Sequence, residues 1–417
     1  MDKIKVMGKS NLFGSVDIGG SKNASLPILV SSLLNKNDLI LKNTPELEDT
    51  KSMIKLLSSF GVLVKKKNNK LILNALKLKN NIADYDLVRK MRASILVLGP
   101  LLTRFNKVKI SLPGGCAIGT RPIDIHLEAL SKLGVKFNIE NGFVIGEIKD
   151  HLRGAGITLP FPSVGATENL IMAATFAKGN TIIKKPAKEP EIIDLCNALN
   201  KMGAKIIGHG SSCIKIQGVN YLNKSEHTIM FDRIVAGTFV IAGVMLNKKF
   251  IINNIVPEYL KSLTNVLKKM KANLIINSES ITVLPSKKII GTVLQTAPYP
   301  GFPTDLQAQI MALMCLANNS SKIIEKIFEN RFMHVAELNR LGANIKIKND
   351  TAFIEGNTNF KGAQVMASDL RASVSLVLAA LCAEGETIIN RVYHLDRGYE
   401  KIEKTLGKCG VNIIREK

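Results

Sequence analysis

A short signature recurs six times along the 417-residue chain, at intervals of 68 to 73 residues. In each copy a glycine, or once a lysine, stands between a predicted amphipathic helix and a valine or alanine. Self-similarity at a fixed period indicates a chain built from repeated supersecondary units. The signature residues are Gly61, Gly134, Gly203, Lys271, Gly342 and Gly410.

The third copy shows what one unit contains. Ser163 is a suitable N-cap for its first helix, and Gly179 is a suitable stop. The predicted elements are a strand over 157–160, an apolar helix over 164–178, a strand over 181–186, an amphipathic helix over 189–202 and a hairpin formed by KIIGHG and CIKIQGV. The predicted order of elements is therefore βαβαββ.

The first helix of a unit is apolar nearly all round, as in RIVAGTFVIAGVML at 233–246 and RASVSLVLAALCA at 371–383. A helix without a polar face is buried on every side. We therefore expect these helices inside, with the sheets and the amphipathic helices around them. The predicted fold class is α/β, with two similar domains of three units each.

The polar residues of these helices gather at the N-terminal ends, where free N–H groups and the helix dipole favour anions. If the helices of a domain run parallel, their starts converge on one face. We expect two such faces to oppose each other across a cleft that suits a multiply anionic ligand. The residues concerned are Lys22, Asn23, Arg92, Ser163, Arg233, Asp305, Asp369 and Arg371.

Composition narrows the classes of function. A formal charge of +23 is typical of nucleic-acid binding, but the chain has no tryptophan and only 5% aromatic residues on which bases could stack. We therefore expect solvated lysines and no nucleic-acid partner. The six cysteines form no CxxC motif, the first residues lack the apolar stretch of a signal peptide, and no apolar run could span a membrane. These features predict a cytoplasmic protein with reduced thiols.

Motifs for the common cofactors are absent. The chain contains no GxxxxGK[ST], no HExxH and no GxGxxG between a strand and a helix, and its histidines lack the spacing of metal ligands. His126 and His394 are expected to be structural hydrogen-bonding groups. Asp305 and Asp369 each open a helix, where a carboxylate is either an N-cap or first-turn residue, or a general base. Spacing alone favours the N-cap or first-turn position.

One loop, LPGGCAIGTRP at 112–122, carries a single cysteine, Cys116, between glycines. A lone cysteine is more often a small core residue, but glycine-rich flanks suit a loop that closes over a substrate. A neighbouring arginine would favour the thiolate. Arginines also stand out in a lysine-rich chain, because bidentate recognition of carboxylate or phosphate needs their geometry. Those at helix starts or in glycine-containing loops are Arg92, Arg121, Arg331, Arg371 and Arg397.

Several strings together resemble the family of UDP-N-acetylglucosamine 1-carboxyvinyltransferases, which are enolpyruvyl transferases, in register along the whole chain. They are SKNASLPIL, DLVRKMRASI, LPGGCAIGTRP, PSVGAT, TAPYPGFPTDLQAQ, FENRFMHVAEL, MASDLRASVSLVLA and YHLDRGYEKIE. The resemblance implies a two-domain inside-out α/β barrel with three βαβαββ repeats per domain. It also implies an N-terminal domain at 22–229 that carries the loop 112–122, a C-terminal domain made of 1–21 and 230–417, and an active site in the interdomain cleft.

The resemblance further implies a reaction. The enolpyruvyl group of phosphoenolpyruvate passes to the 3′-hydroxyl of UDP-N-acetylglucosamine, and phosphate leaves, by addition and elimination through a tetrahedral ketal. This is the first committed step of peptidoglycan precursor synthesis. Asp305 matches the family's base, and Cys116 matches the donor of a proton to the methylene carbon, which also forms a thioketal. Asp369 matches a second carboxylate near the ketal, and Lys22 and Arg397 complete the implied catalytic set.

The same resemblance assigns the binding residues. For phosphoenolpyruvate it implies Lys22, Arg121 and Arg397 at the phosphate, Arg331 and Arg371 at the carboxylate, and Asn23 at the reacting region. For the UDP-sugar it implies Arg92, Arg121, Pro122, Ile123, Asp124, Ile125, Phe161, Pro162, Ser163, Val164, Asp305 and Ile327. Phe161 departs from the family, whose members can carry a basic or polar residue there.

Two other functions stay open. The first is that of the related 3-phosphoshikimate 1-carboxyvinyltransferases, which share the fold and phosphoenolpyruvate but work without such a thiol. The second is a basic nucleic-acid-binding protein, which only the net charge supports. For the transferase we expect no metal or redox cofactor, no membrane association and a monomer.

Overall fold

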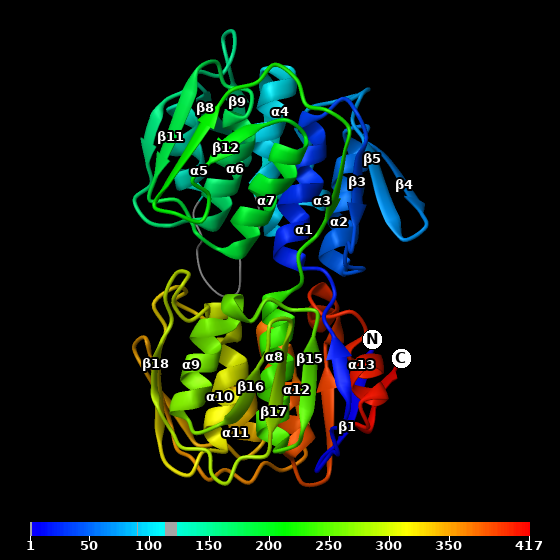
Figure 1. Ribbon diagram of the computed structural model, residues 1–417, viewed down its shortest axis with the longest axis vertical. Helices are drawn as coiled ribbons and strands as arrows, with labels where there is room; N and C mark the ends of the chain where they lie inside the picture. Colours follow the sequence, from blue (N-terminus) through cyan, green and yellow to red (C-terminus); the bar gives the residue numbers. More distant parts are fainter. Residues whose placement is uncertain (1, 90, 113–122) are drawn as a thin grey trace. The chain divides into compact units, whose positions relative to one another are not determined.

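The computed structural model describes residues 2–89, 91–112 and 123–417, which form two compact units. The N-terminal unit contains residues 20–112 and 123–230, and the C-terminal unit contains residues 2–19 and 231–417. The described residues form six four-stranded sheets, three in each unit (Figure 1). The α/β fold class and the six repeats are therefore confirmed.

In the N-terminal unit, the strands in sheet order are β14 (Ser225–Thr228), β3 (Leu39–Lys42), β5 (Lys70–Asn74) and β4 (Leu63–Lys67); β6 (Ile82–Ala83), β7 (Lys107–Ser111), β9 (Phe143–Glu147) and β8 (Lys136–Glu140); and β10 (Gly156–Thr158), β11 (Asn180–Lys184), β13 (Cys213–Gln217) and β12 (Lys205–Ile207). Its helices are α1 (Lys22–Ser31), α2 (Glu48–Ser59), α3 (Tyr85–Val88), α4 (Leu98–Phe105), α5 (Asp124–Ser131), α6 (Val164–Ala174) and α7 (Pro190–Lys201), with 3-10 turns η1 (Ser32–Leu34) and η2 (Arg92–Val97).

In the C-terminal unit, the strands in sheet order are β16 (Asn273–Ile276), β17 (Ser280–Leu284), β15 (Phe250–Asn253) and β2 (Ser15–Asp17); β18 (Val293–Gln295), β19 (Ser321–Ile324), β21 (Thr351–Ile354) and β20 (Ile345–Lys348); and β22 (Gln364–Met366), β23 (Glu386–Asn390), β1 (Lys3–Met7) and β24 (Ile413–Glu416). Its helices are α8 (Arg233–Leu246), α9 (Lys261–Lys269), α10 (Gln307–Cys315), α11 (Val335–Arg340), α12 (Leu370–Cys382) and α13 (Ile402–Lys408), with 3-10 turns η3 (Pro257–Leu260), η4 (Thr304–Leu306) and η5 (Val392–Arg397).

All six sheets share one pattern, in which a first strand runs parallel to a second and the next two strands are antiparallel to their neighbours. In the third repeat, β10 pairs with β11 in parallel, and β11, β13 and β12 follow in antiparallel order. The predicted βαβαββ order is confirmed. The predicted helix over 164–178 ends earlier, at Ala174, where the Phe176 and Ala177 N–H groups donate to carbonyls only three residues back, at Ala173 and Ala174, and the chain turns.

The apolar helices lie in the interior, as predicted. In the C-terminal unit, α8, α10 and α12 pack against one another, and almost every residue of α8 and α12 is buried. Figure 1 shows these helices side by side with the strands outside them. Gly243 lets α8 approach β17 closely, because a Cβ at this position would lie 3.1 Å from Val283. No helix among the described residues is both long and apolar enough to cross a membrane.

In the N-terminal unit, one buried amide ties the inner helices together. The Asn169 side chain in α6 accepts from the Gly99 N–H of α4 at 2.9 Å and donates to the Ile95 carbonyl at 2.9 Å. Its Nδ2 also lies 3.1 Å from His126 Nδ1 in α5. Because an amide nitrogen only donates, Nδ1 of the neutral ring accepts and the proton sits on Nε2. The prediction that His126 is a structural hydrogen-bonding group is therefore confirmed.

Gly99 provides a test of this helix contact. Alanine is normally favoured over glycine inside a helix by about 1 kcal/mol. Here a Cβ would lie 2.8 Å from both the backbone oxygen and Oδ1 of Asn169, so we expect Gly99→Ala to destabilise the protein by about 1–3 kcal/mol. Urea denaturation followed by circular dichroism measures the change. Gly156→Ala in β10 is the control, because nothing lies within 4 Å of that Cβ, and a stable Gly99→Ala protein would contradict the close packing of α4 and α6.

The buried ring of His126 makes stability depend on pH. Burial, with the charge of Arg92 nearby, lowers the pKa of His126 to about 4, below the ordinary value of 6.5. Between these two values the unfolded chain binds the proton and the folded chain does not, so acid favours unfolding. We expect the free energy of unfolding to fall as pH drops from about 6.5 toward 4. His126→Gln should weaken this dependence in urea titrations at a series of pH values, and an unchanged slope would contradict the assignment.

Candidate active site

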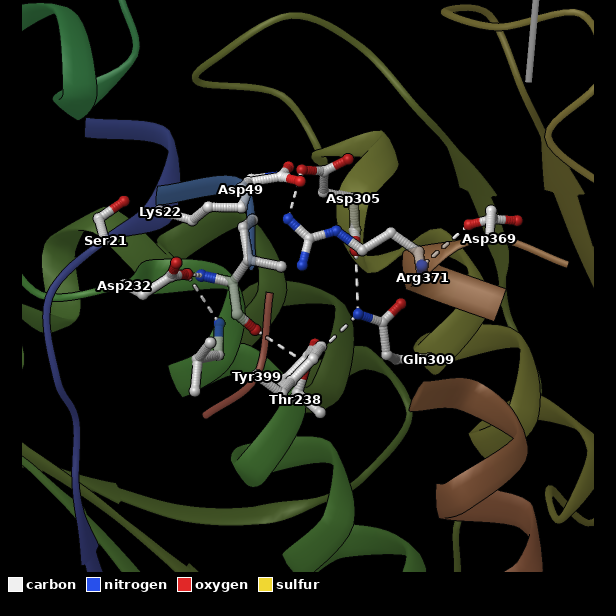
Figure 2. A network of polar contacts seen from close by, with 12 residues as sticks. Ser21, Lys22, Asp49, Asp232, Thr238, Asp305, Gln309, Asp369, Arg371 and Tyr399 are labelled. Atoms are coloured by element: carbon white, nitrogen blue, oxygen red, sulfur yellow. Dashed lines mark hydrogen bonds and ion pairs between the residues drawn. The ribbon is translucent and has the colours of Figure 1, made fainter. Parts of the chain in front are cut away.

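Asp305 lies between two buried arginines in the C-terminal unit. Arg331 Nη2 donates to its Oδ1 at 2.9 Å, and Arg371 Nη2 donates to its Oδ2 at 2.7 Å. Both guanidinium side chains are 4% exposed, whereas that of Asp305 is 26% exposed. Figure 2 shows Arg371 reaching from the start of α12 toward Asp305 in η4. Three residues that the resemblance assigned from distant parts of the sequence therefore meet at one carboxylate.

The charge of Arg371 is held by its surroundings. Burial works against the guanidinium, but the nearby Asp305, Tyr399 and Asp232 more than offset it, so the pKa of Arg371 lies above its ordinary value. A buried charge persists only where opposite charges and hydrogen bonds compensate for the lost hydration. Arg371 is therefore a permanent cation beneath a partly exposed carboxylate.

A polar relay lies below this ion pair, inside the helix bundle. Gln309 Nε2 donates to the Asp305 backbone carbonyl at 2.9 Å and to Thr238 Oγ1 at 3.2 Å. Thr238 Oγ1 lies 2.8 Å from the Tyr399 hydroxyl, and Tyr399 is itself buried (Figure 2). The relay joins α8, α10 and the segment after η5 under Asp305. None of these three residues was predicted, although Thr238 and Gln309 are polar residues within apolar helices.

Two further aspartates begin buried helices of this unit. Asp369 Oδ1 accepts from the Arg371 and Ala372 N–H groups at 2.8 and 3.1 Å, and Asp232 caps α8 in the same way. The capping prediction is thus correct for Asp369. Asp305 is not the N-cap residue but lies in the first turn of η4, which was the other position predicted for it, and its carboxylate accepts from the two arginines. The starts of α8, α10 and α12 converge, as predicted for this unit.

Arg397 closes η5 and is partly buried. Its neighbour Asp396 accepts from Arg415 Nη1 of β24 at 2.9 Å, which ties the turn to the sheet. His394 lies in the same turn. The prediction that it is a structural hydrogen-bonding group is wrong for Nδ1, which has no hydrogen-bond partner among the described residues. Its ring instead lies 4.2 Å, centroid to centroid, from that of Tyr393.

The N-terminal unit carries its own polar residues at helix starts. Ser21 caps α1 through the Ala24 N–H, and Lys22 and Asn23 form the first turn of that helix. Lys22 Nζ lies 3.2 Å from Asp49 Oδ2 in α2, and the two side chains are 13% and 5% exposed. Asp49 was not among the predicted site residues, because no sequence pattern distinguishes it. This ion pair holds the Lys22 ammonium group at the N-terminal end of α1.

Most of the described residues expected at the UDP-sugar lie in the N-terminal unit, at the starts of α5 and α6. Ile123, Asp124 and Ile125 lead into α5, and Phe161 to Val164 lead into α6, where Ser163 is the predicted cap. The His126 ring of α5 packs closely against Gly165 of α6, since a Cβ added at Gly165 would lie 3.3 Å from His126 Nε2. This contact joins the two helices. Arg92 starts η2 and acts on His126 electrostatically. The Phe161 side chain is 56% exposed.

Three of the predicted site residues lie outside the described part of the chain. Cys116, Arg121 and Pro122 fall within 113–122 and are not described. Ile327 is described and follows β19 in the C-terminal unit.

Among residues 2–89, 91–112 and 123–417, no three histidine, cysteine or carboxylate side chains form a cluster that could hold a metal ion.

Comparison with known proteins identifies the family. The family model described as EPSP synthase (3-phosphoshikimate 1-carboxyvinyltransferase) matches residues 6–406. A UDP-N-acetylglucosamine 1-carboxyvinyltransferase of Pelagibacter ubique is 52% identical over 100% of both chains. That of Azorhizobium caulinodans is 49% identical, covering 100% of this chain and 99% of the relative.

Solved structures show the same fold at lower identity. The enolpyruvyl transferase NikO from Streptomyces tendae superposes with a TM-score of 0.91 at 22% identity, covering 99% of this chain and 98% of that one. EPSP synthase from Acinetobacter baumannii gives a TM-score of 0.78 at 17% identity over 100% of both chains. With relatives near 50% identity along its full length, the chain belongs to the enolpyruvyl transferase family, in the group of UDP-N-acetylglucosamine 1-carboxyvinyltransferases.

Proposed function

We propose that this chain transfers the enolpyruvyl group of phosphoenolpyruvate to the 3′-hydroxyl of UDP-N-acetylglucosamine and releases phosphate, in peptidoglycan precursor synthesis. The observation that carries the proposal is full-length identity of 52% and 49% to proteins named for this reaction. The matching family model carries the name of the 3-phosphoshikimate enzyme, but the solved example of that enzyme is only 17% identical. The sugar nucleotide is therefore the favoured acceptor.

Asp305 is the proposed base. An ionised carboxylate is needed to accept the hydroxyl proton, and two cationic neighbours at 2.7 and 2.9 Å favour its ionised form. Each guanidinium donates to Asp305 through one Nη2 atom and has five N–H donors in all. Arg331 and Arg371 are therefore suited to bind the carboxylate of phosphoenolpyruvate while they orient the base.

The remaining steps follow the family's chemistry. After the 3′-oxygen adds to C2 of phosphoenolpyruvate, Cys116 supplies a proton to C3, and this gives the tetrahedral ketal. Loss of a proton from C3 and of phosphate from C2 then restores the double bond. In this proposal Lys22, Arg121 and Arg397 neutralise the phosphate as it leaves. Asn23 and Asp369 lie at the reacting carbons. The UDP-sugar is bound by Arg92, Ile327 and the segments around Ile123 and Ser163.

The proposal extends to the setting of the enzyme. We place it in the cytoplasm, as a monomer that acts without a metal or redox cofactor. The five cysteines of the described residues are all free thiols, which suits a reducing compartment. The proposed domain division is 22–229 against 1–21 and 230–417.

The direct test is release of inorganic phosphate from phosphoenolpyruvate in the presence of UDP-N-acetylglucosamine. We expect turnover by the wild type and a loss of about a thousandfold in kcat for Asp305→Asn, because the amide cannot take the proton. Asp86→Asn, whose side chain is 80% exposed, is the matched control and should keep full activity. Turnover with shikimate 3-phosphate in place of the sugar nucleotide would contradict the proposal.

Cys116 is tested by a second experiment. Fosfomycin should alkylate the wild-type protein once, as read by intact mass, and Cys213→Ser should behave in the same way. Cys116→Asp should retain measurable turnover, because a carboxylic acid can also deliver a proton, and should gain no adduct. An adduct on Cys116→Ser, or complete inactivity of Cys116→Asp, would remove Cys116 from the proton-donor role.

A further inference from the structure

Glu325 is a buried carboxylate to which the family resemblance gives no role. It directly follows β19 and is 5% exposed. Its Oε1 accepts from Thr296 Oγ1 at 2.8 Å and from the N–H groups of Ile327 and Phe328 at 2.8 and 3.3 Å. Its Oε2 accepts from Thr304 Oγ1 at 2.9 Å. All four donors are uncharged, so hydrogen bonds to neutral groups compensate for the lost hydration of this buried carboxyl group.

The fold does not need a carboxylate at this place. The residue after the second strand of the sheet has a left-handed backbone in four other repeats, at Asn43, Lys185, Asn254 and Arg391, with φ between 53° and 60°. The remaining repeat has Leu112, which borders residues outside the described chain. Glu325 has no positive φ, and its side chain instead accepts hydrogen bonds from the residues of its own turn. We call Glu325 and its donors Thr296, Thr304, Ile327 and Phe328 the Glu325 clamp. The clamp is a local feature of one repeat, because the corresponding turn in the other repeats is formed differently.

Glu325 joins the two segments that contain Asp305 and lead to Arg331 in the candidate active site. Thr304 directly precedes Asp305 in η4, and Ile327 and Phe328 begin the stretch that leads to Arg331. The Thr296 hydroxyl accepts from the Lys326 N–H at 2.9 Å, which closes the clamp on its third side. The Asp305 carbonyl is held separately by Gln309. One buried carboxylate thus sets the position of the base relative to the backbone at Ile327.

We propose that Glu325 is a positioning residue that holds the Asp305 turn and the Ile327–Phe328 backbone in one geometry, so that the base meets the hydroxyl of a sugar bound at Ile327. The inference rests on the function proposed above. Catalytic groups lose rate steeply when they are displaced, by about a hundredfold for 1 Å. Removing the hydrogen bond from the Thr304 hydroxyl to Glu325 should therefore lower kcat without weakening the proposed binding of the sugar at Ile327.

The test compares four variants by phosphate release. Thr304→Val removes one donor to Glu325 at nearly constant volume, and we expect kcat to fall about tenfold while KM for UDP-N-acetylglucosamine changes by less than about twofold. Thr304→Ser keeps the hydroxyl and should recover most of the rate. Glu325→Ala also frees the Ile327 N–H, so kcat should fall and KM should rise. Thr264→Val is the control, because Thr264 is a buried threonine of the same unit that bonds only to its own helix, at Lys261.

Hydrogen exchange provides a readout that does not depend on turnover. Peptides covering 303–309 and 325–331 should exchange faster in Thr304→Val than in Thr264→Val, since only the first variant opens the clamp. A wild-type kcat in folded Thr304→Val, an equal loss in Thr264→Val, or no recovery in Thr304→Ser would overturn the positioning role. If the wild type itself released no phosphate, the proposed function would fail, and unchanged exchange in Thr304→Val would separately overturn the clamp.

Discussion

Each unit is built around helices that have no polar face, and this constraint places the candidate site. A helix that is buried on all sides can carry polar groups only at its ends or where a partner lies within the bundle. In the C-terminal unit the starts of α8, α10 and α12 converge, and Asp305 and Arg371 meet there. The polar residues that remain inside, such as Thr238 and Gln309, bond to one another and to the Asp305 backbone.

The ion pairs of Asp305 show how burial and charge are balanced. Arg331 and Arg371 are almost fully buried, and a guanidinium in such a place needs an anion. Asp305 supplies that anion in the structure described here, and the carboxylate of phosphoenolpyruvate would supply another in the proposed reaction. The same two arginines therefore stabilise the unit and prepare it for an anionic substrate. Two further hydrogen bonds hold the turn that carries Asp305: Glu325 accepts from the Thr304 hydroxyl on the loop side, and Gln309 donates to the Asp305 carbonyl from within the bundle.

Much of the fold was predictable because repetition and hydrophobic pattern are properties of the chain itself. The βαβαββ order, the inner helices and the Asp369 cap follow from spacing and residue type. Details that depend on competition between local bonds were not predictable. The end of α6 is the point where the Phe176 and Ala177 N–H groups bond to carbonyls three residues back, and the orientation of Asp305 is decided by two arginines that are 26 and 66 residues away.

The architecture and the residue types at the candidate site can be inferred from the amino-acid sequence alone. The period of the repeats, the apolar helices and the polar residues at their starts are readable without coordinates, and the family resemblance assigned Asp305, Arg331 and Arg371. Which side chains contact one another is visible only in the folded structure. The Glu325 clamp, the Tyr399 relay and the Lys22–Asp49 ion pair join residues from separate elements, and their partners are selected by packing in three dimensions. Such contacts leave no period in the sequence, because each is made once and at a different separation along the chain.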